Sequence, residues 1–278
     1  MTKRYRVKLN LARNCLRYVI KAYCIREIYL PYYICPTVIS AIRKENCYIK
    51  FYHINEDFSP NTENIPTEAY VLYPNYFGIS AKHVRALSLK YQNLIVDNAH
   101  NFYMPDCGLV SFNSLRKFFN VKDGAYLYTS KLCEENFALD DYFYETFDSL
   151  TYEDMKENEI RLNNQDIKLI SITTERYIDC INIEQEKLKR LEKFKFFHER
   201  YKGINELNIE LTNADVPFVY PLLSKNDKIV EELEQEGHII LRYWNTLPDN
   251  FEEYRFYCNL IPIPLNSNIY VRKNTLHK

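Results

Sequence analysis

No apolar run in the sequence approaches the roughly 20 residues of a membrane-spanning helix, and neither charge sign dominates, since 36 basic side chains face 37 acidic ones. A formal net charge of −1 provides no electrostatic footprint for nucleic acid or for an anionic membrane. The basic amino terminus leads into mixed polar and apolar residues, so it lacks the apolar centre of a signal peptide. These absences predict a soluble, cytoplasmic protein with no nucleic-acid partner and no membrane span.

The eight cysteines and six histidines are scattered along the 278 residues. The cysteines form no C-x-x-C pair, and a chain of this length has a core large enough to need no disulfides. We therefore expect reduced and mostly buried thiols. The histidines form neither an H-x-x-x-H motif nor a Cys/His cluster, so no metal site is predicted.

Short, β-rich apolar segments recur in the first half of the chain and alternate with helical patterns. The segments lie near residues 28, 48, 70, 94 and 110, and helices are expected at 36–43 and 81–91. Pro36 occupies the first helical position, where its missing N–H costs nothing. This rhythm is typical of βαβ units and predicts an α/β domain with a mainly parallel sheet.

Longer helices are expected around this sheet. Residues 7–27 have an amphipathic pattern, residues 134–164 read as an acidic and aromatic helical connection, and residues 177–201 read as one long helix. The end of the chain predicts a βαβ module, with strands at 216–223 and 239–244 around a helix at 226–235. We expect a large domain over residues 1–165 and a small α/β domain, with its linking helix, over residues 166–278.

Chemically useful side chains follow two of the expected strands. The run Leu94-Ile95-Val96 ends at Asp97, with His100 shortly after it. The next strand leads into a turn that contains Arg116 and Lys117, before Asp123-Gly124 opens a third strand. Because α/β proteins place functional groups at strand ends, this stretch predicts the site. The alternative is a structural role, in which Asp97 forms a turn and Arg116 and Lys117 are solvated surface residues.

The order of these residues resembles the DegT/DnrJ/EryC1/StrS group of pyridoxal 5′-phosphate (PLP) aminotransferases. That group has a D-x-A-H or D-x-A-Q element, then an S-F-x-x-x-K turn and a Gly-Gly strand. The matching residues here are Asp97, Ala99, His100, Ser111, Phe112, Lys117, Gly124 and Ala125. Lys117 lies six residues after Ser111 instead of five, and Ala125 replaces the second glycine.

The resemblance implies the fold of a type I PLP-dependent enzyme with a cofactor-binding large domain. It implies that Lys117 binds PLP covalently and moves the substrate proton, while Asp97 keeps the pyridine nitrogen protonated. Arg116 has the family's spacing from Ser111, but a guanidinium does not lose its proton; Lys122 is the third candidate. The other cofactor contacts that it implies are His100 near the phenolic oxygen, Ser111, Ser114, Arg13 and Asn14 at the phosphate, and Tyr33 or Cys35 on the ring.

The resemblance further implies that an amino group passes from an amino-acid donor, glutamate, to a nucleotide-linked keto sugar in surface polysaccharide or related glycan biosynthesis. It implies a homodimer, with the aromatic and acidic segment after Ala138 as contact surface. Trp244 and Arg242 are candidates for a substrate entrance, and the alternative for Trp244 is a core position. Two other functions stay open. One is a PLP enzyme of different reaction type, and the other is a non-catalytic relative that binds a sugar nucleotide or a partner chain, suggested by the altered turns at Ala12 and Ala125.

Overall fold

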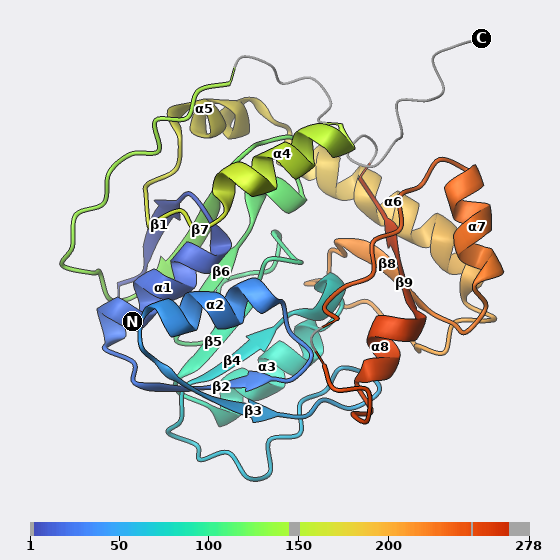
Figure 1. Cartoon of the computed structure of the whole chain (residues 1–278), viewed down its shortest axis with the longest axis horizontal. Helices are drawn as coiled ribbons and strands as arrows, with labels where there is room; N and C mark the ends of the chain where they lie inside the picture. Colours follow the sequence, from blue (N-terminus) through green and yellow to red (C-terminus); the bar gives the residue numbers. More distant parts are fainter. Residues whose placement is uncertain (1–2, 145–150, 246, 267–278) are drawn as a thin grey trace.

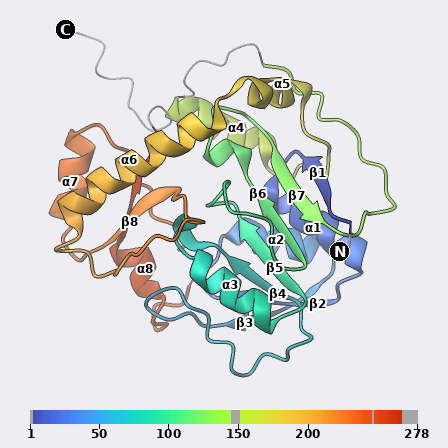
Figure 2. The ribbon, with the colours of Figure 1, turned by 180° about the vertical axis from the view of Figure 1, so that it is seen from behind.

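The computed structural model describes residues 3–144, 151–245 and 247–266. A large sheet forms the centre of the molecule, with α1 (Ala12–Tyr23) and α2 (Pro36–Lys44) on one face (Figure 1) and α3 (Ala81–Lys90) on the other (Figure 2). A smaller sheet and its helices lie beside it. Apolar side chains fill both faces of the large sheet, and the cluster on the α3 face continues into the small sheet.

The large sheet has seven strands, in the order β1-β7-β6-β5-β4-β2-β3. Their bounds are β1 (Tyr5–Leu9), β2 (Glu27–Pro31), β3 (Tyr48–Tyr52), β4 (Val71–Pro74), β5 (Leu94–Asn98), β6 (Val110–Asn113) and β7 (Ala125–Thr129). β3, β2, β4, β5 and β6 run parallel, while β7 is antiparallel to both of its neighbours. The predicted α/β class with a mainly parallel sheet is confirmed, as are the five strands expected from the sequence.

The helical expectation for residues 7–27 is wrong at its amino-terminal end. Tyr5–Leu9 is strand β1, paired with β7 in the register Tyr5↔Thr129 to Leu9↔Ala125. Backbone pairing with a strand more than 100 residues away outweighs the local amphipathic pattern. Helix α1 begins only at Ala12, which places its first turn beside the ends of the parallel strands.

The acidic connection and the long helix also differ from expectation. Of residues 134–164, only α4 (Tyr152–Leu162) is helical among the residues described; 145–150 lie outside them. Backbone bonds to Leu169 hold the chain around Leu139 extended. The expected helix 177–201 is two helices, α5 (Ile172–Cys180) and α6 (Ile183–Tyr201), because the Asn182 side chain caps a new helix by accepting from the Gln185 N–H at 3.0 Å.

The C-terminal part is not a βαβ module. Strand β8 (Val219–Leu223) pairs antiparallel with β9 (Leu260–Pro264), and α7 (Lys228–Gln235) and α8 (Tyr254–Asn259) lie between them in the chain. Residues 239–244 form no strand. The guanidinium of Arg242 instead donates to the carbonyl of Cys258 and to the carboxylate of Asp227. These contacts hold the segment as a loop.

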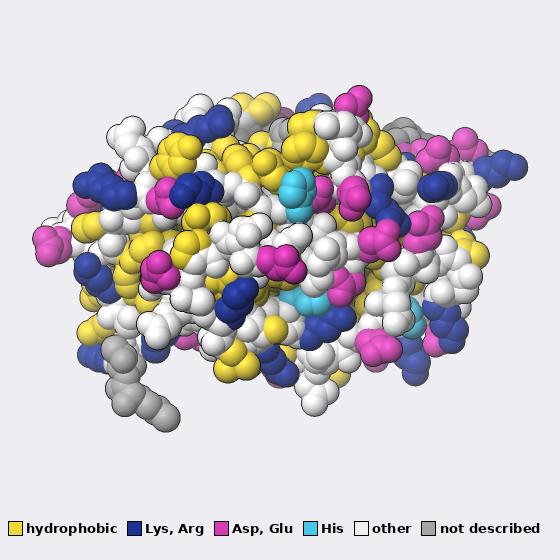
Figure 3. Space-filling model, turned by 90° about the horizontal axis from the view of Figure 1, so that it is seen from below, with side chains coloured by type: hydrophobic (Ala, Val, Ile, Leu, Met, Phe, Trp, Pro, Cys, Tyr) yellow, Lys and Arg dark blue, Asp and Glu magenta, His cyan; other side chains and the backbone are white. Residues whose placement is uncertain are grey.

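The thiols are less buried than expected. Cys15 and Cys47 are buried, but Cys24, Cys180 and Cys258 are exposed. Within the described ranges, no helix is long and apolar enough to cross a membrane, and no group of three or more potential metal ligands was found there. The face in Figure 3 carries basic and acidic side chains interspersed, without a field of one sign.

Candidate active site

A cavity of about 240 Å³ opens at the carboxyl ends of the parallel strands. β2 leads into Cys35, β4 ends at Pro74, β5 carries Asp97, and the turn after β6 carries Lys117, all of which line the cavity. Chain segments far apart in sequence meet here because every parallel strand delivers its following residue to the same edge. The first turn of α1 and Trp244 complete the wall.

Lys117 and His100 are in direct contact within this cavity. The Lys117 Nζ lies 2.7 Å from His100 Nε2 and 5.0 Å from the centre of the Phe218 ring. Burial lowers the pKa of Lys117 below its ordinary value, with Asp97 and Cys35 acting in the opposite direction. Burial, followed by the charge of Lys117, also lowers the pKa of His100 well below its ordinary value.

Hydrogen bonding assigns the protonation states of this pair. The backbone N–H of Phe77 donates to His100 Nδ1 at 3.3 Å. A neutral imidazole has one N–H, so we assign its proton to Nε2. An Nε2–H that faces Nζ can only donate to an amine with a free lone pair. Lys117 is therefore assigned as the neutral amine, which is the nucleophilic form.

Asp97 supplies the carboxylate of the site. Its Oδ1 accepts the backbone N–H of Ala99 at 2.9 Å. Burial raises the pKa of Asp97 to about 6. The Ala99 N–H opposes this rise, as does Lys117 in its protonated form. The carboxylate faces the cavity, where a cationic partner such as a protonated ring nitrogen would restore an ordinary pKa.

Aromatic rings hold the imidazole of His100 in place. Phe218 and Trp244 stack on it at 5.1 and 5.8 Å between ring centres, and Phe77 stacks at 5.7 Å. Phe77 and Trp244 have φ angles of 53° and 59°. Bulky residues seldom adopt this left-handed region, and such outliers cluster at functional sites. Trp244 is thus a wall of the cavity, whereas Arg242 is engaged in the loop contacts described above.

Positive groups gather at another part of the cavity. Arg13, Arg116 and the first turn of α1 line it, together with the buried Ser114. The free N–H groups at a helix amino terminus carry partial positive charge, and α1 has no acidic residue in its first turn. This arrangement suits an anion such as a phosphate.

Three expected cofactor contacts lie outside the cavity. Ser111 donates its hydroxyl to Asp106 at 2.7 Å. The Asn14 amide donates to Asn10 and to the carbonyl of Asp166, and it lines a smaller neighbouring cavity. Tyr33 is fully buried and stacks on Tyr76. The structure does bring together the other six predicted residues, which are Lys117, Asp97, His100, Ser114, Arg13 and Cys35.

Sequence reasoning missed a charged residue of the cavity lining. Glu159, on α4, reaches the cavity and forms an ion pair with Arg116. It lies in the acidic stretch that the sequence presents as a solvated face, and no motif marks it. Arg116 also lines the cavity, and the sequence marks this position only through its neighbour Lys117.

No protein-family model matches the sequence, and no curated protein is significantly similar to it. Solved structures do match. A DegT/DnrJ/EryC1/StrS aminotransferase from Brucella abortus superposes with a TM-score of 0.63 at 12% identity, over 94% of this chain and 80% of the other. The chain has the fold of these aminotransferases.

Two further structures share this type I fold. Spr1654 from Streptococcus pneumoniae, in its PLP form, matches with a TM-score of 0.59 at 15% identity, over 94% of this chain and 82% of its own. A variant of the GDP-4-keto-6-deoxymannose-3-dehydratase ColD, with bound GDP-perosamine, matches with a TM-score of 0.62 at 15% identity, over 94% and 84%.

The donor set of the cavity fits PLP. A neutral lysine amine can bond to the aldehyde, and a carboxylate of raised pKa can pair with the protonated ring nitrogen. The amino terminus of α1 and Arg13 can bind the phosphate. The arrangement combines a nucleophile, a proton-holding carboxylate and an anion site in one cavity.

Proposed function

We propose that this chain is a PLP-dependent aminotransferase that acts on a keto sugar carried by a nucleotide. The observation that carries the proposal is the contact between Lys117 and His100 in the cavity that also holds Asp97. These groups lie at the carboxyl edge of a sheet whose fold is shared with a DegT/DnrJ/EryC1/StrS aminotransferase and with Spr1654, which is named as a sugar aminotransferase and was solved in its PLP form.

Each residue of the cavity has a defined task in this proposal. Bound PLP supplies an electron sink for the negative charge that develops on the substrate carbon. Lys117 provides the amine that binds the cofactor and then accepts and returns the substrate proton. Asp97 keeps the ring nitrogen protonated, and His100 orients the Lys117 amine. Arg13, Ser114 and the α1 terminus bind the phosphate.

The finer parts of the proposal have different supports. A nucleotide sugar as substrate is supported by ColD, whose structure holds GDP-perosamine. Glutamate as amino donor and glycan biosynthesis as pathway are implied only by the resemblance to the aminotransferase family. A cytoplasmic location and the division into domains 1–165 and 166–278 are expectations from the sequence.

A PLP enzyme of different reaction type is the second candidate. The observation in its favour is that ColD, which shares this fold, is named as a dehydratase. Both reactions begin from the same cofactor-bound amine. Product analysis separates them, because amino transfer to a sugar consumes one amino donor per product, whereas loss of a hydroxyl group leaves the sugar without nitrogen.

The test is to locate PLP on the protein. After incubation with PLP and reduction with borohydride, peptide mass mapping is expected to find the pyridoxyl group on Lys117. Lys117→Arg should abolish both this label and amino transfer from glutamate to a keto-sugar nucleotide. Lys122→Arg, which changes a lysine at the nearby turn, is the matched control and should retain both.

Two results would contradict the proposal. A label on Lys122 would mean that the cofactor lysine is misassigned. Absence of any label, with sugar-nucleotide binding intact in calorimetry, would establish the non-catalytic alternative.

A further inference from the structure

Helix α4 brings a negative charge to the most positive part of the cavity. Glu159 pairs with Arg116, and both line the cavity together with Arg13. Arg13 also donates to the carbonyl of Leu162 at the end of the same helix. An anion that enters at the arginines therefore meets a carboxylate that is already there.

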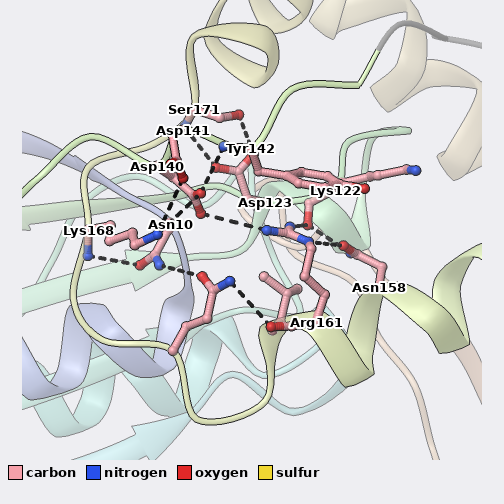
Figure 4. Close-up of polar contacts among 12 residues, drawn as sticks. Asn10, Lys122, Asp123, Asp140, Asp141, Tyr142, Asn158, Arg161, Lys168 and Ser171 are labelled. Atoms are coloured by element: carbon pink, nitrogen blue, oxygen red, sulfur yellow. Dashed lines mark hydrogen bonds and ion pairs between the residues drawn. The ribbon is translucent and has the colours of Figure 1, made fainter.

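The helix itself is firmly attached, as Figure 4 shows. Asn158 and Arg161 point from α4 to the carbonyl of Lys122 and donate to it at 2.8 and 3.3 Å. The Arg161 guanidinium also lies 3.6 Å from the centre of the Tyr142 ring. These contacts do not involve Glu159, so the backbone of α4 can stay in place while the Glu159 side chain moves.

The Glu159 side chain has room to move. It is 51% exposed, whereas Arg116 is only 13% exposed. Burial would raise the pKa of Glu159, but Arg116 and, more weakly, Arg13 and Lys117 outweigh this and hold the pKa below its ordinary value. The residue is a carboxylate at neutral pH. Its rotation into solvent would leave the partly buried Arg116 with its charge unpaired unless another anion replaced the carboxylate.

We propose that Glu159 is a resident counter-ion that makes this end of the cavity selective for phosphate dianions over singly charged anions. A singly charged anion would only replace the Glu159 carboxylate with an equivalent charge, so its binding gains little free energy. A phosphate dianion carries twice the charge toward Arg13 and Arg116, so it displaces Glu159. The inference rests on the proposed function only in naming the phosphate as that of PLP.

The experiment uses inorganic phosphate and acetate as probes of the ligand-free protein at pH 8, with binding followed by the shift in melting temperature. Glu159→Gln removes the competing charge and keeps the shape. It is expected to bind phosphate about fivefold more tightly, the upper range for a half-exposed ion pair. It should also respond to acetate, whereas the parent protein is expected not to respond.

Glu157→Gln is the matched control, because Glu157 is exposed on the same helix and lies outside the cavity lining. It changes the net charge equally and should bind both anions as the parent does. Glu159→Asp keeps the charge but withdraws the carboxylate from Arg116, so it should also bind phosphate more tightly. This second variant keeps the test decisive if Glu159→Gln unfolds.

Either of two outcomes would overturn the inference. Equal phosphate binding by Glu159→Gln and Glu157→Gln would make the ion pair an ordinary surface contact. Weaker phosphate binding by both Glu159 variants would mean that Glu159 only orients Arg116. Inorganic phosphate binds without any reaction at Lys117. The phosphate-binding result therefore stands even if PLP labelling of Lys117 fails.

Discussion

A lysine and an aspartate that share one cavity lose hydration together, and the loss acts in opposite directions on their pKa values. Burial lowers the pKa of Lys117 and raises that of Asp97 to about 6. Both shifts favour the uncharged form. The site is thus prepared for a ligand that supplies charge to Asp97 and bonds to Lys117.

Asp97→Asn is expected to stabilise the ligand-free protein at pH 7.5. Because its pKa is raised from 3.8 to about 6, the folded carboxylate binds its proton more tightly than the unfolded one. The penalty of ionising Asp97 is absent below about pH 3.5 and complete above about pH 7. Removing this penalty should add up to about 3 kcal/mol to the free energy of unfolding, and screening by solvent in the cavity lowers this figure. Urea unfolding of the parent protein and of Asp97→Asn, at pH 7.5 and at about pH 3.5, measures the difference.

Asp57→Asn is the comparison of opposite sign. Burial would raise the pKa of Asp57, but hydrogen bonds from Ser59, and then the charges of His83 and Lys82, hold it below its ordinary value. Asp57→Asn should therefore destabilise at pH 7.5, where the charged form contributes. Destabilisation by Asp97→Asn as well as by Asp57→Asn would show that burial does not control the pKa of Asp97.

At the level of elements, the sequence predicts what is encoded locally. β2 to β6 stand out as short apolar runs, and Pro36 marks the start of α2. β1 escaped prediction because its strand character depends on β7, far along the chain. The ends of the expected strands predicted the part of the candidate site that contains Asp97, His100 and Lys117. Glu159 was missed because only the tertiary position of α4 gives it a partner.

One tight turn connects the site to the C-terminal part. Gly78 has a φ of +77°, and a Cβ there would lie 2.3 Å from the His100 carbonyl oxygen and 2.8 Å from that of Val216. Gly78→Ala should cost about 2 kcal/mol or more in the free energy of unfolding, through backbone strain and steric conflict. It should also slow PLP labelling of Lys117, because His100 has to shift.

Gly203→Ala is the matched control for this prediction. A Cβ at Gly203 would meet no atom within 4 Å, so its stability should change by no more than about 0.5 kcal/mol or rise slightly. Denaturant unfolding and the labelling rate compare the two variants. Equal, small effects would mean that the Gly78 turn can relax without disturbing the site.

At the scale of the whole molecule, one surface is unusually apolar. A groove of about 830 Å³ is lined by Leu139, Phe143, Ile172 and Tyr177, among others. The Phe143 side chain is 69% exposed and that of Ile172 is 49% exposed. Exposed apolar areas rimmed by polar residues are typical of contacts between proteins. The dimer contact expected from the sequence lies in the segment after Ala138, which contributes more than half of the residues that line this groove.

We expect a homodimer that buries the groove, with an interface on the order of 2,000 Å² or more if it is obligate. Light scattering at micromolar concentration should give twice the 33.4 kDa of one chain. Ile172→Glu combined with Phe143→Glu places charge in the contact and should give folded monomers. Leu89→Glu is the control, because Leu89 is 92% exposed on α3, and it should stay dimeric. A parent protein of 33.4 kDa, or a double variant that remains dimeric, would contradict this assignment of the interface.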